Sequence, residues 1–415
     1  MDKELLYTYL RLHFIPDRDM VGLPQTHKEQ LITDHDKALR LIDDTLRGAI
    51  EEYVDLIDGE WGAFLSGGID SSLVCSYLKE IKPNLHVFSI GSDGKKHDES
   101  SLSKEYANLI GVEQHLYKMD SSIAKEFLEY VDNAITEPFG DISLIPTTFV
   151  AKKAKDFGLQ ACFSGDGGDE LFFGYPRYWS VAKNVKYQNC PLGVKKALYG
   201  FDRVFFKNRH INSVVFCDSQ AEAHLGLHSR LGDEEFHKLC PFVDTKFPEW
   251  FDTFNYMNQN DELDLLIKMR EAEFKFMGDK GLRKLKLAST RTGLKILTPM
   301  LHHKFIEAAL RVSPYLSYGG GKKKQILKDL LAYRVPGAPI DNQKRGFLIP
   351  LGQWIKEDLR EPFTRVLLDD DMISFFGMDK QVLSGILQSH LNGEKDHKTT
   401  LFTIYTLFRW KAHQK

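Results

Sequence analysis

The seven residues from Ser66 to Ser72 (SGGIDSS) lie between two apolar runs and combine residue types that suit phosphate binding. Glycines let a backbone pass close to a ligand, and serines supply hydroxyl donors. A helix starting here would add the free N–H groups of its first turn. A carboxylate suits a phosphate site when a cation bridges the two charges, which points to Mg²⁺. We therefore expect phosphate binding by Ser66, Gly67, Gly68, Asp70, Ser71 and Ser72.

The simpler interpretation of this stretch is a strand-to-helix turn capped by serines. The chain has no G-K-S/T sequence, so the stretch is not the phosphate loop of ordinary nucleoside triphosphatases. One carboxylate and three serines between a buried strand and a helix favour the phosphate-binding interpretation.

A second acidic stretch, Asp166–Glu170 (DGGDE), follows another short apolar run. It could be a solvated turn. Its carboxylates, together with Asp70, would suit a hard cation that takes oxygen ligands.

The elements that position these stretches alternate between strands and helices. Apolar runs predict strands over 61–65, 85–91, 115–119 and 159–165. Helical periodicity or capping predicts helices from Lys37, from Ser71, and over 98–111, 121–136 and 143–157. This alternation predicts an α/β fold with a doubly wound parallel sheet, in which ligands bind at the carboxyl ends of the strands.

The strand signal fades after residue 183, where amphipathic helices are expected over 262–276, 302–312 and 324–333. We expect three parts: a leader or remnant over 1–37, an α/β core over about 38–182, and an α-helical C-terminal lobe over about 183–415.

Composition excludes several classes. The net charge of −3 gives no global case for nucleic-acid binding. No apolar run approaches the roughly 20 residues of a membrane helix, and the first residues do not form a signal peptide. The five cysteines are scattered without a C-x-x-C pair, which argues against zinc and suits a reducing compartment. We expect a cytoplasmic protein without a nucleic-acid or membrane partner.

Four motifs in order resemble the synthetase domain of B-type asparagine synthetases. SGGIDSS looks like the pyrophosphate loop of N-type ATP pyrophosphatases, also called the PP-loop family. The other three are EPFGDISLIPT from Glu137, FSGDGGDELFFGYPRY from Phe163 and QKRGFLIPLGQWI from Gln343. The resemblance covers roughly residues 38–415.

The resemblance implies that ATP activates a carboxylate as an acyl-adenylate with release of pyrophosphate, after which an amine attacks the acyl carbon and AMP leaves. It implies that Asp70 and Asp169 hold Mg²⁺, that Asp166 accepts a proton from the amine, and that Lys344 steadies negative charge during adenylation. Positions matching adenine, ribose and α-phosphate contacts are Leu65, Ile90, Ser164 and Gly165. Lys324 either reaches phosphate or belongs to a solvated basic loop.

The chain departs from the family pattern in two regions. Glutamine-dependent members begin with a glutaminase domain whose nucleophile is an N-terminal cysteine, whereas Asp2 follows Met1 here and the first cysteine is Cys75. We therefore expect no glutaminase domain, with ammonia arriving free or from a separate glutaminase. In the helical lobe, charged family positions are replaced by Lys295, Leu297 and His302, and Phe173 replaces a glycine.

Several functions therefore stay open. The first is an ATP-dependent ligase that amidates a small-molecule carboxylate, such as aspartate or a sugar uronate. The second uses the substrate's own amine, as β-lactam synthetases and lasso-peptide cyclases do. The third is an inactive ATP-binding partner subunit, which the retained Asp70, Asp166, Asp169 and Lys344 speak against. A tRNA-modifying pyrophosphatase lacks support, because no basic stripe or zinc-type cysteine set is present.

Overall fold

The computed structural model describes residues 1–20, 22–92, 100–132, 137–188, 190–197, 216–229, 231–318, 322–340 and 349–414, with only the backbone at 131–132. Its centre is a five-stranded parallel sheet with strand order β3-β2-β1-β4-β5. The strands are β1 (Trp61–Phe64), β2 (His86–Ser92), β3 (Glu113–Met119), β4 (Ala161–Phe163) and β5 (Lys295–Leu297). The predicted α/β class with a parallel sheet is confirmed.

Alternating side chains on the strands build two separate cores. On β1, Ala63 belongs to a cluster with Leu73 and Leu78 of the following helix, whereas its neighbour Phe64 packs with Val150 on the opposite face. Val87 and Phe88 divide in the same way on β2. This period of two is expected when helices cover both faces of a sheet.

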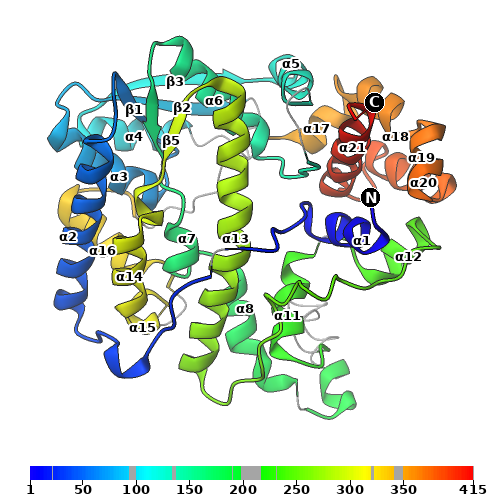
Figure 1. Ribbon diagram of the computed structural model, residues 1–415, viewed down its shortest axis with the longest axis horizontal. Coiled ribbons are helices and arrows are strands. Elements are labelled where there is room, and N and C mark those ends of the chain that lie inside the picture. Colours follow the sequence, from blue (N-terminus) through cyan, green and yellow to red (C-terminus); the bar gives the residue numbers. More distant parts are fainter. Residues whose placement is uncertain are drawn as a thin grey trace.

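Helices cover both faces of the sheet (Figure 1). One face carries α2 (His35–Val54), α3 (Ile69–Ile81), α4 (Ser100–Ile110), α14 (His303–Arg311) and α16 (Gln325–Arg334). The other carries α5 (Ser121–Asp132), α6 (Leu144–Asp156) and the 31-residue α13 (Glu262–Thr292). Asp261 caps the start of α13, and Gly293 ends it in a left-handed conformation.

The second half of the chain contributes an edge strand, which we did not expect. β5 pairs with β4 in parallel, from Ala161 opposite Lys295 to Phe163 opposite Leu297. This strand lies within the segment of about 183–415 for which we expected a helical lobe. A strand of three residues at a sheet edge carries too few side chains to show a period in the sequence.

The remaining described helices lie mainly on the right and lower parts of Figure 1, with α7 near its centre. They are α7 (Gly168–Leu171), α8 (Pro176–Asn184), α11 (Gln220–His228), α12 (Asp233–Leu239), α15 (Pro314–Tyr318), α17 (Leu351–Lys356), α18 (Arg360–Leu367), α19 (Asp370–Phe376), α20 (Lys380–Leu391) and α21 (Lys398–Ala412), with short 3₁₀ turns η1 (Lys28–Gln30), η2 (Val185–Tyr187) and η3 (Pro299–Leu301).

The first residues form a buried helix within the segment that we expected to be a leader or remnant. Helix α1 (Lys3–Leu12) begins at an Asp2 cap and buries Leu6, Tyr9 and Leu10. The Tyr9 hydroxyl donates to the Thr403 carbonyl of α21 at 3.0 Å, so this segment packs against the other end of the chain. Among the described residues, no helix is both long and apolar enough to cross a bilayer.

Candidate active site

The first loop, at Ser66–Ser72 after β1, and the second loop, at Asp166–Glu170 after β4, lie against each other, backbone to backbone. A Cβ atom at Gly165 would lie 2.5 Å from the Ser71 nitrogen, and one at Gly168 would overlap the Asp70 carboxylate. Both glycines are therefore required by this close approach. Gly67 has φ +76° and packs against Ser103 at the start of α4, so its role in the structure is the turn itself.

Asp70 and Asp169 share one cation, the ammonium group of Lys324. Lys324 Nζ lies 2.5 Å from Asp70 Oδ2 and 2.7 Å from Asp169 Oδ1. Lys324 is buried rather than part of a solvated loop, and its backbone N–H donates to the Phe172 carbonyl at 3.2 Å. Burial alone would lower the pKa of Lys324, but the two carboxylates outweigh it and the pKa is raised. The position between the Asp70 and Asp169 carboxylates therefore favours a positively charged group.

The serines of the first loop are tied to one another at the start of α3. Ser71 Oγ lies 3.0 Å from Ser66 Oγ and accepts from the Ser66 N–H at 3.2 Å. The Ser72 hydroxyl is fully buried and finds no hydrogen-bond partner within the described parts of the chain. Such an unsatisfied group is costly and is common at functional sites.

Asp166 lies between Ser164 and a lysine that the sequence analysis did not single out. The Ser164 hydroxyl donates to Asp166 Oδ2, and Lys284 Nζ of α13 lies 3.1 Å from Oδ1. Asp166 and Asp141 outweigh the burial of Lys284 and raise its pKa, so this side chain is a cation. The Ser164 N–H donates to the Leu297 carbonyl of β5 at 2.8 Å, which fixes the loop on the sheet.

Glu170 is buried beside Asp169 on the second loop. Burial and the neighbouring negative charge of Asp169 raise the pKa of Glu170 to about 7. The Tyr175 hydroxyl donates to its carboxylate, and the Tyr178 hydroxyl donates to its backbone carbonyl at 3.0 Å. The second loop is therefore held in place by Tyr175 and Tyr178, which follow it in the chain.

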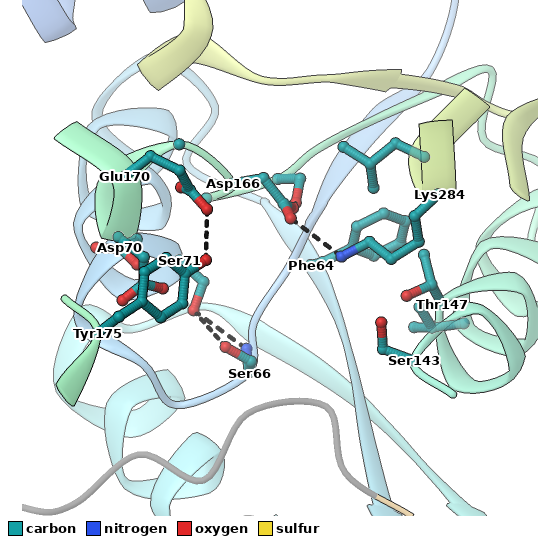
Figure 2. A pocket seen from close by; sticks show the side chains of 16 residues that line it. Phe64, Ser66, Asp70, Ser71, Ser143, Thr147, Asp166, Glu170, Tyr175 and Lys284 are labelled. Atoms are coloured by element: carbon teal, nitrogen blue, oxygen red, sulfur yellow. Dashed lines mark hydrogen bonds and ion pairs between the residues drawn. The ribbon is translucent and has the colours of Figure 1, made fainter. Parts of the chain in front are cut away.

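A cavity of about 200 Å³ opens over both loops. In Figure 2, Asp166 lies between Asp70, Ser66 and Ser71 on one side and Lys284 on the other. From the sequence-predicted set, the lining contains Ser66, Asp70, Ser71, Ser164, Gly165, Asp166 and Asp169, and it adds Phe64, Ser143, Thr147, Val150, Gly167, Glu170, Tyr175, Lys284 and Leu285.

Other predicted residues lie beside this cavity or outside the described chain. Leu65 is buried after β1, where its N–H donates to Phe88 and its carbonyl accepts from the Ser89 hydroxyl at 2.6 Å. Ile90 lies near the carboxyl end of β2, beyond the part of that strand that pairs with β1. Lys344 lies outside the described residues.

The departures from the family pattern have structural roles. Phe173 has φ +58°, a conformation natural for glycine, and its buried ring packs 4.8 Å from that of Tyr178. His302 Nε2 lies 3.2 Å from Glu52 Oε2 of α2, and Lys295 is exposed at the start of β5. None of these three residues lines the cavity, and the two loops keep their contact.

The parallel sheet and the two loops at its carboxyl edge define a synthetase fold of the PP-loop type. The family model described as asparagine synthase matches residues 41–412, and the chain belongs to this family of ATP-dependent amide-forming ligases.

Several curated relatives are asparagine synthetases. An asparagine synthetase (glutamine-hydrolysing) of Bacillus subtilis is 25% identical over 444 residues, which cover 99% of this chain and 69% of that protein. A putative asparagine synthetase of Methanocaldococcus jannaschii is 35% identical over 43% of this chain and 42% of its own length. A putative asparagine synthetase of Mycobacterium tuberculosis is 22% identical, and the match covers 85% of this chain and 54% of that protein.

Proposed function

We propose that this protein adenylates a small-molecule carboxylate with ATP and then transfers ammonia or an amine to it, forming an amide. The observation that carries the proposal is the cavity in which the serine-rich loop and the acidic loop meet, with Asp70 and Asp169 on one cation. In this reaction the leaving pyrophosphate needs positive charge and fixed donors, and both are placed at one edge of the sheet.

The loop at Ser66–Ser72 and Lys324 would bind the phosphates of ATP. Asp70 and Asp169 would hold Mg²⁺, because two carboxylates that already share one cation offer the oxygen ligands this ion prefers. When bound, Mg²⁺ neutralises charge on the phosphate oxygens. The buried Ser72 hydroxyl is not part of the cavity lining. Lys344 remains the proposed second cation near the carboxylate being activated.

The amine step would take place near Asp166. Its carboxylate is held in the cavity by Ser164 and Lys284, so one oxygen can accept the proton of an attacking amine. Lys284, whose pKa is raised by Asp166 and Asp141, brings a positive charge to this carboxylate. The backbone of Leu65 and Ile90 would contact adenine, and Ser164 and Gly165 would lie near the α-phosphate and ribose.

Two alternatives differ in the amine donor and in the acceptor acid. Ammonia, free or from a separate glutaminase, would make the product a primary carboxamide of aspartate or a sugar uronate. An amine of the substrate itself would instead close a ring. None of the replaced residues Lys295, Leu297 and His302 lines the cavity, so they do not decide between these alternatives.

A pyrophosphate-release assay tests the proposal. The protein is incubated with ATP, Mg²⁺ and ammonium while the carboxylic acid is varied, and we expect acid-dependent pyrophosphate and AMP. Release of ADP and phosphate would contradict adenylation of the acid. Tight ATP binding without turnover for any acid would instead favour the inactive partner subunit. Turnover that does not require ammonium would identify the ring-closing reaction.

Asp70→Asn should abolish pyrophosphate release without unfolding the protein, and Asp36→Asn, on the exposed start of α2, is the matched control. Normal turnover by the Asp70 variant would remove its proposed role at the metal.

A further inference from the structure

His86, Glu113 and His115 form a cluster at the edge of the sheet, away from the cavity. His86 and Glu113 begin β2 and β3 and lie opposite each other in register, and His115 follows on the edge strand β3. The cavity loops follow the carboxyl ends of β1 and β4, so this cluster lies at the opposite end of the sheet. The proposed reaction uses none of these three residues.

The potential ligand atoms already have the spacing of a metal site. His86 Nδ1 lies 3.1 Å from His115 Nε2 and 3.5 Å from Glu113 Oε2. His115 Nε2 lies 3.9 Å from Glu113 Oε1. Ligand atoms around a tetrahedral Zn²⁺, with bonds of about 2.0–2.1 Å, are separated by about 3.3 Å. Little movement is therefore needed for all three side chains to contact one ion.

The imidazole rings are held in place by aromatic neighbours. The His115 ring stacks on Phe88 at 4.9 Å and lies 4.6 Å from the Phe157 ring, which is also 4.9 Å from His86. Burial and the neighbouring His86 lower the pKa of His115. The side chains of His86 and His115 are still 25% and 21% exposed, which leaves access for water.

We propose that His86, Glu113 and His115 bind a divalent transition-metal ion, with Zn²⁺ as the best fit and water as the fourth ligand. Two imidazole nitrogens and one carboxylate select such an ion over Mg²⁺, which prefers oxygen ligands. The ion would tie the edge strand β3 to β2 at the end of the sheet opposite the cavity.

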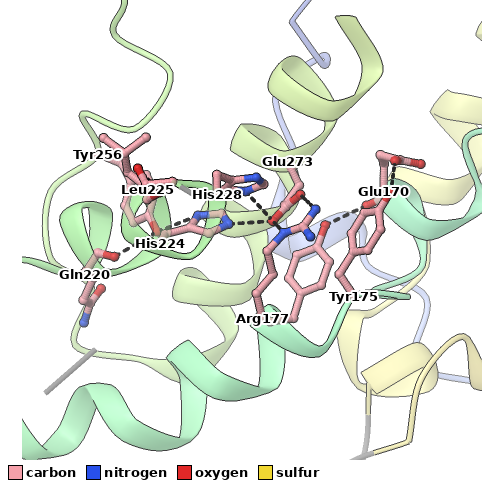
Figure 3. Close-up of polar contacts among 11 residues, drawn as sticks. Glu170, Tyr175, Arg177, Gln220, His224, Leu225, His228, Tyr256 and Glu273 are labelled. Atoms are coloured by element: carbon pink, nitrogen blue, oxygen red, sulfur yellow. Dashed lines mark hydrogen bonds and ion pairs between the residues drawn. The ribbon is translucent and has the colours of Figure 1, made fainter. Parts of the chain in front are cut away.

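A second His–His–Glu group among the described residues differs in a decisive way. His224 and His228 of α11 both lie within 3.0 Å of one oxygen of Glu273, but Arg177 forms a salt bridge with both oxygens of the same carboxylate (Figure 3). The guanidinium already supplies the positive charge, and a divalent ion beside it would be repelled in this buried place. We therefore assign no metal to this group.

Calorimetric titration of the metal-stripped full chain with Zn²⁺ tests the proposal. Millimolar Mg²⁺ is present throughout, so that the carboxylates of the cavity do not compete. We expect one site of micromolar affinity or tighter. His115→Phe keeps an aromatic ring against Phe88 and Phe157 while removing the ligand, and it should weaken Zn²⁺ binding at least about tenfold.

Two further variants separate metal binding from folding. Glu113→Gln changes only one mostly exposed side chain and should also weaken binding. His35→Ala removes another exposed histidine, which lies between Asp36 and Asp329, and should leave binding unchanged. Cobalt supplies a second measurement, because four-coordinate Co²⁺ absorbs strongly in the visible range. Millimolar affinity, six-coordinate Co²⁺, or binding unchanged in both His115→Phe and Glu113→Gln would overturn the proposal.

Discussion

Replacing Lys324 by methionine would leave Asp70 and Asp169 facing each other without the cation that joins them. The side chains of Lys324 and Asp70 are only 7% and 3% exposed, so the charge left behind is largely buried. Removing one partner of a buried ion pair costs about 3–5 kcal/mol. Asp169 is 27% exposed and can regain water, so we expect the lower end, about 3 kcal/mol. For a chain of this length that corresponds to a Tm lower by roughly 3–4 °C.

Magnesium should restore much of this loss in Lys324→Met, because a divalent ion can take the place of the ammonium between the two carboxylates. The same ion should stabilise the unchanged protein much less, since Lys324 already occupies that place. Thermal unfolding with and without millimolar Mg²⁺ measures both effects. Lys322→Met removes an exposed lysine two residues away and is the matched control.

The reasoning is refuted if Lys324→Met unfolds at the same temperature as the unchanged protein. It is also refuted if the variant is destabilised but does not respond to Mg²⁺, because the two carboxylates would then not form a cation site.

Three further predictions concern single side chains. Phe173→Gly relieves about 1 kcal/mol of left-handed strain but loses a buried ring worth about 3 kcal/mol or more, so denaturant unfolding should show a net loss of about 2 kcal/mol; equal or higher stability would contradict this balance. Lys284→Met should leave acid-dependent ATP–pyrophosphate exchange within a few-fold while slowing amide formation at least about tenfold, because Asp166 loses its ion pair; an equal loss in both assays would place Lys284 in adenylation instead. Burial lowers the pKa of His228 to about 3, whereas a histidine in the unfolded chain has a pKa of about 6.5. Unfolding therefore takes up a proton between these values, and stability falls by up to about 1.4 kcal/mol for each unit that the pH drops. His228→Gln should reduce the loss of unfolding free energy between pH 7 and pH 5, as measured by denaturant titrations. An equal loss in the variant and the unchanged protein would contradict this prediction.

The sheet and its two carboxyl-edge loops could be predicted because local signals agreed with the fold. Each strand near the loops is an apolar run followed by glycine and a carboxylate, and helix signals separate the runs. Parallel strands then place the loops after β1 and β4 at one edge, which explains why Asp70 and Asp169 lie together. The metal and proton-transfer roles of these residues stay predictions.

The cations around the loops could not be chosen from the sequence. Lys284 is one of several basic residues on α13, and only the packing of that helix shows which one turns to Asp166. Lys324 ends a run of three lysines, and its buried position depends on a left-handed backbone conformation and a bond to Phe172. Helix α1 was missed because its apolar face includes tyrosines, and its partner α21 lies at the far end of the chain.

Because β5 forms one edge of the sheet, the part of the chain that carries Ser66–Ser72 is not a separable nucleotide-binding module. A fragment ending near residue 182 would leave β4 with unpaired backbone groups along one side, which invites aggregation. It would also lack Lys284 and Lys324, both supplied by later helices. Chimeras with relatives should therefore exchange the whole span from α2 to α16, since a junction after β4 would divide both the sheet and the cavity.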